Sequence, residues 1–370
     1  MIPSERSHLF ASAITHPGMT GKGNEDRYSI TAYRLEDENH TPVVFAIIAD
    51  GVGGHRAGEI AAEIAVNTIS HAIATSNGSE PLETLEYAII QAGEAIFTQS
   101  SKDENQRGMG STCVCVWVIG NQLYTASVGD SRIYLLQGDT IRQITIDHTW
   151  VQEALEHGII QPEQARNHPR SHIIRRYLGS KNAVVPDLRL KLSSEETDEQ
   201  ARANQGLQLS AGDQLLLCSD GLSDLVEDQE ILDAFQNQEL PEGLSTLVEL
   251  ANQRGGHDNI TILALKVPAP NEIPQTNLPT KSQTKPRILP WMTCALIGII
   301  VTLIVVLVAG AIWLFNRPTD TPPPTPLPET TIPATYTLTP ADLETTETPI
   351  PSETPIQATL TPWPTDTPDS

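Results

Sequence analysis

Three aspartates stand where apolar segments of strand length end or begin, and carboxylates in such places can hold metal ions. Asp50 closes the run VVFAIIAD and precedes Gly51, and Asp220 closes DQLLLCSD and precedes Gly221. Asp258 lies in the turn GGHDN directly before the run ITILALKV. A carboxylate at the end of a buried strand is costly unless a cation or a hydrogen-bond network compensates its charge. If the three side chains converge, their mutual repulsion requires a bound metal.

Two interpretations of these aspartates are open. Each aspartate alone is typical of an ordinary strand end or turn, whereas the set, with its glycines, favours a metal centre. Gly51 lets the backbone approach closely enough for its carbonyl oxygen to act as a ligand, and Gly221 permits an equally tight chain exit. A site made only of oxygen ligands favours Mg²⁺ or Mn²⁺ over zinc, which prefers histidine and cysteine.

Apolar periodicity indicates the elements that position these residues. The spacing of Ile, Val and Ala predicts helices at Ala57–Thr75 and Leu82–Phe97. Runs rich in Val and Ile predict strands at Val43–Ala49, Thr112–Ile119, Leu123–Val128, Arg132–Leu136, Leu215–Cys218 and Ile260–Val267. Because several strands follow one another as hairpins, the pattern favours an α+β fold with antiparallel sheets over a parallel doubly wound sheet.

The composition excludes several classes of protein. The 370 residues carry a net charge of −23, which argues against nucleic acid as a partner because phosphate-backbone binding needs a basic face. The four cysteines have the spacing of neither a zinc site nor a disulfide framework, so the folded part is expected in a reducing compartment. Cys113 and Cys115 alternate with valines on a predicted strand and are expected to be packing residues.

The chain divides into four segments of different character. Residues 1–267 are globular in composition, and residues 268–287 form a juxtamembrane linker. Residues 288–315 contain no charged residue and are long enough to cross a bilayer as one helix. Residues 316–370 are rich in Thr-Pro pairs and are expected to be a disordered, extended tail, because such a chain cannot form a hydrophobic core.

Charged residues around the apolar segment predict its orientation. Lys281, Lys285 and Arg287 precede the segment, whereas Arg317 alone follows it closely. The positive-inside rule places residues 1–287 in the cytoplasm and the tail outside, in a single-pass cell-membrane protein. The lack of an apolar N-terminal run that could act as a signal peptide agrees with this expectation.

A series of short motifs in register resembles a known family. The sequence is similar to the bacterial branch of the metal-dependent protein phosphatases, the type-2C serine/threonine phosphatases, from about residue 10 to residue 267. The motifs are Asn24-Glu25-Asp26, Asp50-Gly51-Val52-Gly53-Gly54-His55, Gly58-Glu59, Gly110-Ser111-Thr112, Val128-Gly129-Asp130-Ser131-Arg132, Asp147-His148, Ser219-Asp220-Gly221-Leu222-Ser223-Asp224 and Asp258-Asn259.

The resemblance implies a fold and a metal centre. The fold would be a four-layer αββα sandwich, in which two antiparallel sheets are flanked by helices and two metals lie in a cleft at one edge. Asp50 would bridge both metals, and the Gly51 carbonyl, Asp220 and Asp258 would complete the protein ligands. The cofactors would be two to three Mg²⁺ or Mn²⁺ ions.

Further residues receive roles only through the resemblance. Asp26 and Glu25 would orient metal-bound waters, so that Asp26 and Asp50 together activate the attacking water. Asp130 and Asp224 correspond to the positions that hold a third metal in bacterial relatives. Residues from about 150 to 185 resemble the mobile flap beside the cleft.

The implied reaction is an in-line attack of water on a phosphate ester without a protein nucleophile. The sequence lacks the motifs of phosphatases that use a cysteine or aspartate nucleophile, since no cysteine begins a Cys-x5-Arg loop and no Asp-x-Asp-x-Thr run is present.

Two positions depart from the family pattern. Gly21 replaces an arginine that grips the substrate phosphate, and the neighbouring Lys22 is the candidate phosphate-binding substitute. Val52 replaces a histidine that directly follows Asp-Gly in the animal enzymes, so the general acid stays unassigned among water and the nearby histidines. Those histidines, His55, His148 and His257, are each expected to be structural.

The sequence therefore predicts hydrolysis of phosphoserine and phosphothreonine in proteins at the cytoplasmic face of a prokaryotic membrane. The expected partners are phosphorylated proteins, including membrane serine/threonine kinases and their substrates. One alternative is a catalytically weakened, phosphatase-like metal-binding module with a sensory or interaction role, which the Gly21 departure favours. A second alternative is a structural protein that is tethered to the cell wall.

Overall fold

The computed structural model describes residues 1–53, 56–165, 168–236 and 238–274. The chain divides into two compact units, and the second unit, Pro286–Ser370, lies wholly outside the described residues. The predicted membrane helix at 288–315, the tail at 316–370 and most of the linker at 268–287 therefore lie outside them as well. Within the described ranges, no helix has both the length and the apolar character needed to cross a membrane.

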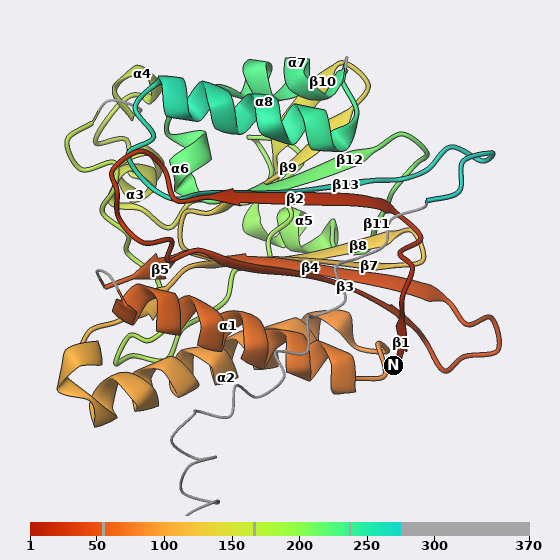
Figure 1. Cartoon of the computed structure of the whole chain (residues 1–370), viewed down its shortest axis with the longest axis horizontal. Coiled ribbons are helices and arrows are strands. Elements are labelled where there is room, and N and C mark those ends of the chain that lie inside the picture. The colour runs from red at the N-terminus through yellow and green to blue at the C-terminus, as the bar shows by residue number, and fades with distance from the viewer. Residues whose placement is uncertain (54–55, 166–167, 237, 275–370) are drawn as a thin grey trace, which may run out of the picture. The chain divides into compact units, whose positions relative to one another are not determined.

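The first unit contains two large antiparallel sheets (Figure 1). The six-stranded sheet has the spatial order β1 (Ile2–Ser4), β3 (Arg27–Arg34), β4 (Pro42–Ala49), β7 (Cys113–Ile119), β8 (Gln122–Val128) and β11 (Leu207–Gln208). The five-stranded sheet has the order β10 (Thr140–Gln143), β9 (Arg132–Gln137), β12 (Gln214–Cys218), β13 (Ile260–Lys266) and β2 (Phe10–His16). A short ribbon pairs β5 (Gly51–Val52) with β6 (Gly110–Ser111).

Helices cover the outer faces of both sheets, as Figure 1 shows. The helices α1 (Arg56–Thr75) and α2 (Pro81–Lys102) pack on the six-stranded sheet. The helices α6 (Asp220–Ser223), α7 (Asp228–Gln236) and α8 (Leu240–Gln253) pack on the five-stranded sheet. Shorter helices lie in the connections, namely η1 (Glu104–Gln106), α3 (Trp150–Glu156), α4 (Pro162–Ala165) and α5 (Asp198–Ala203). The expected four-layer αββα sandwich is confirmed.

Three apolar cores explain why the central strands read as unbroken apolar runs. In β4, Val43, Phe45 and Ile47 pack toward α1 and α2, whereas Val44 and Ala46 pack between the sheets. Successive side chains of a strand point to opposite faces, so a strand covered on both faces must be apolar at every position. Cys113 and Cys115 are free and fully buried on β7, which confirms them as packing residues.

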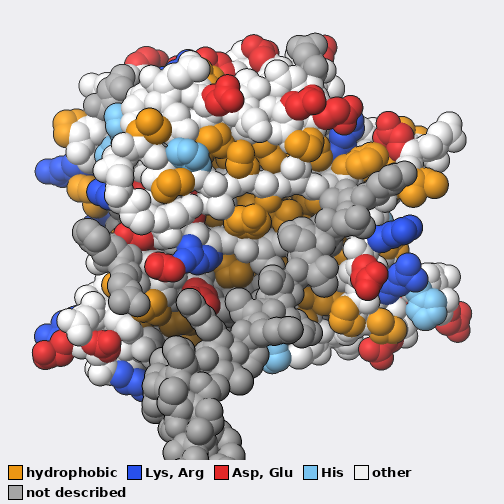
Figure 2. All heavy atoms as spheres, in the orientation of Figure 1, with side chains coloured by type: hydrophobic (Ala, Val, Ile, Leu, Met, Phe, Trp, Pro, Cys, Tyr) orange, Lys and Arg blue, Asp and Glu red, His pale blue; other side chains and the backbone are white. Residues whose placement is uncertain are grey.

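All six predicted strands and both predicted helices are present, with ends that differ by a few residues. The sequence analysis missed β2, β3, α7 and α8. In β2 and β3 many side chains are only partly buried, so polar residues interrupt the apolar pattern. In α7 and α8 the apolar positions occupy one face of each helix and alternate with charged and polar residues, several of them acidic, that face solvent. Figure 2 shows acidic side chains over this layer.

Candidate metal centre

The aspartates predicted as ligands lie at strand ends from both sheets. Asp26 directly precedes β3 and Asp50 lies between β4 and β5, whereas Asp220 follows β12 and Asp258 precedes β13. Figure 1 shows β5 and α6 at the same end of the sandwich. Burial raises the pKa of Asp50 well above its usual range, and the charges of Asp26, Asp220, Asp130 and Asp258 raise it further. The aspartates therefore lie close enough for their charges to interact, as the interpretation as one metal centre predicts.

The backbone of Asp50 is fixed by two hydroxyl residues on a neighbouring segment. The Asp50 amide donates to Thr112 Oγ1 at 3.1 Å, and the Thr112 amide donates to the Asp50 carbonyl at 2.8 Å. Ser111 Oγ also donates to that carbonyl at 2.9 Å. The Gly110-Ser111-Thr112 motif thus positions the central carboxylate, a role that the sequence analysis did not assign.

Asp26 is almost completely buried, with 3% of its surface exposed. Burial raises its pKa to about 7, and the charges of Asp220 and Asp258 act in the same direction. The hydroxyl of Ser219, which donates to Asp26 Oδ2 at 2.8 Å, acts in the opposite direction. A carboxyl with such a pKa is poised to exchange its proton for a cation near neutral pH.

Asp220 and Asp130 share this environment. Burial raises the pKa of Asp220 to about 7, with Asp224 and Asp258 contributing, and burial together with the charge of Asp220 raises that of Asp130 well above its usual range. The buried side-chain oxygens without a hydrogen-bond partner in the described residues include Oδ1 of Asp26, Oδ1 of Asp130 and Oδ1 of Asp220. Oxygen atoms of this kind fit a hard divalent ion such as Mg²⁺ or Mn²⁺, which would supply the missing partner.

Glycines let the backbone pack closely around this centre. A Cβ at Gly51 would overlap the Gly58 carbonyl, and a Cβ at Gly58 would overlap the Glu25 carboxylate. A Cβ at Gly221 would overlap the Asn259 carbonyl. The expected close approach at Gly51 and Gly221 is confirmed, and Gly58 is needed for the same reason.

Asn259 joins the N-terminal loop to the start of β13. Its Oδ1 accepts from the Glu25 amide at 2.7 Å, and its Nδ2 donates to the carbonyls of Pro17 and Gly23, both at 3.1 Å. This side chain holds the loop that carries Glu25 and Asp26 against the segment that carries Asp258. The sequence motif contained Asn259, but nothing in its spacing indicated this function.

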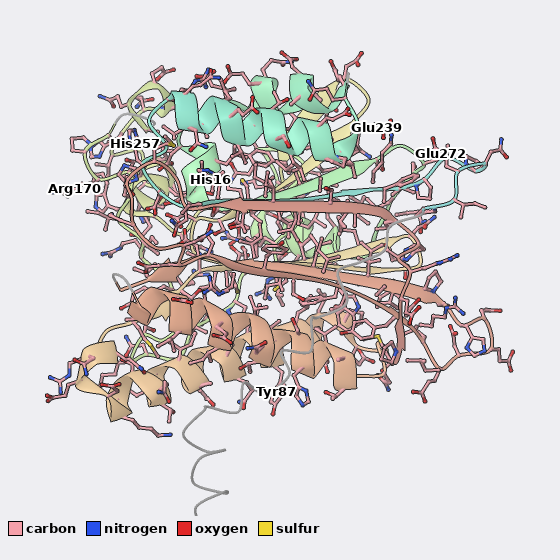
Figure 3. The ribbon with its side chains drawn as sticks, in the orientation of Figure 1. His16, Tyr87, Arg170, Glu239, His257 and Glu272 are labelled. Carbon is pink, nitrogen blue, oxygen red and sulfur yellow. The ribbon has the colours of Figure 1, made fainter. Side chains whose placement is uncertain are left out.

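A cleft of about 940 Å³ opens beside the carboxylates. Asp130, Asp220 and Asp258 lie on one side, and residues between Thr149 and His172 line the other. The predicted flap segment therefore does border the cleft. Figure 3 shows Arg170 and His257 at this end of the sandwich, with Glu239 and Glu272 toward the other end.

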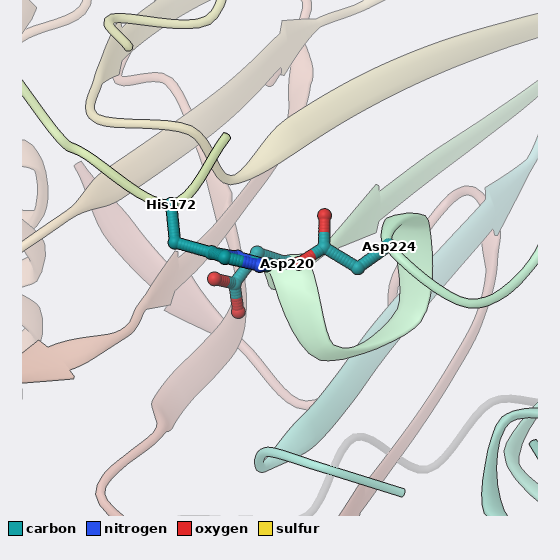
Figure 4. Close-up of side chains that lie close together, drawn as sticks. All are labelled: His172, Asp220 and Asp224. Atoms are coloured by element: carbon teal, nitrogen blue, oxygen red, sulfur yellow. Dashed lines mark ion pairs between the residues drawn. The ribbon is translucent and has the colours of Figure 1, made fainter. Parts of the chain in front are cut away.

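His172 reaches from this segment to the carboxylates. Its Nδ1 lies 3.1 Å from Asp224 Oδ2, and one ligand atom each from His172, Asp220 and Asp224 lie within 4.8 Å of one another (Figure 4). The sequence analysis predicted Asp224 for a third metal but missed His172, because no local pattern links it to residues fifty positions later.

The positions that depart from the family pattern are exposed or open to solvent. Lys22 is exposed, and no described residue forms a hydrogen bond or ion pair with its side chain. Gly21 has a φ of +73°, and a Cβ there would meet nothing within 4 Å, so an arginine would have space but a strained backbone. Val52 is 40% exposed.

Of the three histidines, two are described. His148 is buried, accepts from the Gly129 amide through Nδ1 at 3.0 Å and so donates through Nε2 to Asp187 at 3.2 Å, which confirms its structural role. His257 lines the cleft, and His55 lies outside the described residues.

Comparisons with known proteins agree with this geometry. Residues 19–253 match the family model described as protein phosphatase 2C. The chain is 37% identical over 232 residues to the serine/threonine protein phosphatase PstP of Mycobacterium tuberculosis, covering 63% of this chain and 42% of the relative. It is 36% identical over 263 residues to the serine/threonine phosphatase stp of Listeria welshimeri, covering 70% of this chain and 96% of the relative.

A solved structure shows the same fold. The catalytic domain of PstP in complex with two manganese ions superimposes with a TM-score of 0.57 at 33% identity, and the match covers 70% of this chain and 99% of that one. The match therefore spans nearly all of that catalytic domain, whereas it spans less than half of the curated mycobacterial relative.

Proposed function

This chain belongs to the protein phosphatase 2C family, and we propose that it hydrolyses phosphoserine and phosphothreonine in proteins. The convergence of Asp26, Asp50 and Asp220 carries the proposal. Three raised pKa values and the unpartnered buried oxygens make the ionised form of this cluster unfavourable unless divalent ions bind it.

The donor set fits two to three Mg²⁺ or Mn²⁺ ions. Asp50, Asp220, Asp258 and the Gly51 carbonyl would hold two ions, Asp26 and Glu25 would act through water, and Asp130 and Asp224 would hold a third. When bound, such ions lower the pKa of a water molecule and neutralise the charge of a phosphate ester. A solved relative contains two manganese ions, which supports the choice of ion.

The chain's own residues prepare the site for this chemistry. Thr112 and Ser111 fix the Asp50 backbone, and the Ser219 hydroxyl orients the Asp26 carboxylate. Asn259 fixes the loop that carries Asp26. Because these contacts form before any substrate arrives, little reorganisation is needed during the reaction. The adjacent cleft gives a phosphorylated side chain access to the carboxylates.

We further propose that the catalytic unit works at the cytoplasmic face of the cell membrane, anchored by residues 288–315, with the tail outside. The uncharged apolar segment and the three basic residues that precede it support this orientation. Its substrates would be phosphoproteins that include membrane serine/threonine kinases and their targets.

Phosphate release from a phosphothreonine peptide tests the activity. The detergent-solubilised full chain should release phosphate with Mn²⁺ or Mg²⁺ and stop when chelator is added. A chain that is stabilised by Mn²⁺ against thermal unfolding yet releases no phosphate would support the weakened, metal-binding module instead.

Protease digestion tests the orientation. In right-side-out vesicles, external protease should remove the tail and spare residues 1–287. Digestion of the globular unit from outside would show that the orientation is the reverse of the one proposed. Cytoplasmic proteins could then not be its substrates.

A further inference from the structure

A second cleft lies next to the catalytic one. Its volume is about 340 Å³, and Arg142, Lys191, Gln143, Ser193 and Ser194 are among the residues that line it. We call it the basic cleft. Gln152 lines both clefts.

The main chain also connects the basic cleft to the catalytic cleft. Thr145 and Ile146 line the basic cleft, and the next residue, Asp147, lines the catalytic cleft. The two clefts are therefore adjacent, so one polypeptide segment can contact both.

The cations of the basic cleft are not held by direct ion pairs, unlike several arginines elsewhere in the described chain. Arg132, Arg189 and Arg254 each contact a carboxylate. Arg142 and Lys191, by contrast, form no ion pair and no side-chain hydrogen bond with any residue that the structure describes. Glu196 lies near enough for its charge to interact with that of Lys191, but neither cation of the cleft forms a direct ion pair with a described residue, so both can bind an anion.

The nearby carboxylates are already engaged. Glu196 accepts from the Leu192 amide at 2.8 Å and from Asn204 Nδ2 at 3.1 Å, and these contacts, together with the charge of Lys191, hold its pKa below the usual range. Asp147 accepts from Arg132 at 2.7 Å and from Gln143 Nε2 at 2.7 Å. Their charges weaken the positive potential of the cleft but leave both cations available.

The backbone that carries the two cations is well held. The Lys191 amide donates to the Ile144 carbonyl at 2.9 Å, and Ile144 and the neighbouring Leu190 are buried between the sheets. Arg142 lies on β10, where it pairs with Leu135 of β9. Because the backbone is fixed before binding, less entropy is lost when an anion is captured.

We propose that the basic cleft binds an anionic group of the substrate polypeptide while the catalytic cleft holds the phosphorylated residue. The anion is a second phosphorylated side chain or an Asp or Glu within a few residues of the first. Arg142 can bind it with two parallel hydrogen bonds, and Lys191 adds a point charge. This inference rests on the proposed phosphatase function and deepens it, because it defines a preference for acidic or multiply phosphorylated segments.

The basic cleft contacts no reacting atom. Binding there is equally strong in the ground state and in the transition state, so it lowers KM and leaves kcat unchanged. The contribution decreases at high salt, because exposed charges are screened.

Peptide kinetics test the proposal. Each peptide carries one phosphothreonine and, at one of several spacings on either side, phosphoserine, Glu or Gln. At low salt, we expect KM for the best phosphoserine or Glu peptide to be at least about fivefold below that of its Gln counterpart, with kcat within about twofold. Comparison of the phosphoserine and Glu peptides identifies which anion the site prefers.

Variants assign the effect to the cleft. Arg142→Gln with Lys191→Gln should abolish the preference for acidic peptides and leave the Gln peptides unchanged. Arg6→Gln with Lys102→Gln removes the same charge from exposed positions elsewhere and should preserve the preference. Equal KM values at every spacing in the wild-type chain, or a preference that survives in the first variant, would overturn the proposal.

A binding measurement separates this proposal from the proposed function. Fluorescence anisotropy with the same peptides in chelator reports affinity without turnover. If no peptide is hydrolysed with Mn²⁺, the phosphatase function fails, whereas tighter binding of acidic peptides that depends on Arg142 and Lys191 still supports an anion site. Equal affinities for acidic and Gln peptides refute the site whether or not the chain is active.

Discussion

The two sides of the catalytic cleft are built differently. One side, the sheet wall, carries Asp130, Asp220 and Asp258 at strand ends that belong to the sandwich. The other side, the loop wall, comprises the described residues 149–165 and 168–172, in which the only helices are the short α3 and α4.

The contacts within each wall differ accordingly. Backbone pairing and buried hydroxyls fix the sheet wall. In the loop wall, side chains supply many of the contacts: the rings of Trp150 and His168 stack with centroids 4.8 Å apart, and the Arg170 guanidinium lies 4.8 Å from the Trp150 ring centre. This difference suggests that the sheet wall determines the chemistry and the loop wall determines which polypeptides gain access.

The largest expected effect comes from the sheet wall. Asp50→Asn should lower kcat at least about 100-fold, a barrier increase of at least about 2.7 kcal/mol, because the carboxylate proposed to hold the metals loses its charge. Stabilisation by Mn²⁺ in thermal unfolding should also disappear.

A matched control is Asp233→Asn, at an exposed position of α7, which should keep normal activity. More than a tenth of wild-type kcat in Asp50→Asn would contradict the metal-ligand role of this aspartate.

The pH dependence of stability tests the same wall without substrate. Asp26 and Asp220 have folded-state pKa values near 7, above the unfolded value of about 4, so the folded chain holds these protons more tightly. In chelator, this stabilisation is complete below pH 4 and is lost as the pH rises to 7, at up to about 1.4 kcal/mol per pH unit for each group. Unfolding in denaturant at pH 5, 6 and 7 measures the slope.

Two further measurements distinguish the contribution of these carboxyls to the pH dependence of stability from that of the chain's overall negative charge. Asp26→Asn should flatten the slope in chelator, and saturating Mn²⁺ should reverse it, because the metal competes with protons for the same oxygens. A metal-free wild-type chain that becomes more stable between pH 5 and 7 would show that these carboxyls are ionised without metal.

A smaller effect is expected from the loop wall. Trp150→Ala removes the ring that both His168 and Arg170 contact, a loss of about 1 kcal/mol in ordering this wall. KM for a phosphoprotein should rise about fivefold, whereas kcat for p-nitrophenyl phosphate should stay within about twofold. Tyr87→Ala, at a 62% exposed position on α2, is the aromatic control. An equal loss of kcat on both substrates would mean that the loop wall also contributes to the chemical step, so the two walls do not have separate roles.

The smallest effect is expected at Lys22. If it substitutes for the missing family arginine, Lys22→Ala should raise KM about two- to threefold with less effect on kcat, because an exposed lysine contributes little in water. Lys102→Ala, at the exposed end of α2, should change neither constant. Unchanged kinetics in Lys22→Ala would mean that phosphate is held without this side chain.

The same contrast explains what the sequence could predict. Strands covered on both faces must be apolar throughout, so β4, β7 and β12, and the aspartates that follow β4 and β12, were visible in the amino-acid pattern. Asn259 and His172 were not, because their contacts join segments more than fifty residues apart, and no local spacing records such a contact. β2 and β3 were missed for a related reason: their partly exposed faces carry polar residues that weaken the apolar pattern.

The burial of β4 has a further consequence for the lifetime of the bound metal. Every residue from Val43 to Ala49 is completely buried, and β4 is hydrogen-bonded to β3 on one side and β7 on the other. Such a strand cannot fray alone, so its amides should exchange hydrogen only when the whole sandwich unfolds. The backbone that presents Asp50 therefore stays closed as long as the unit is folded, and release of a metal held by Asp50 would depend on bond breaking at the carboxylates rather than on local opening of the chain.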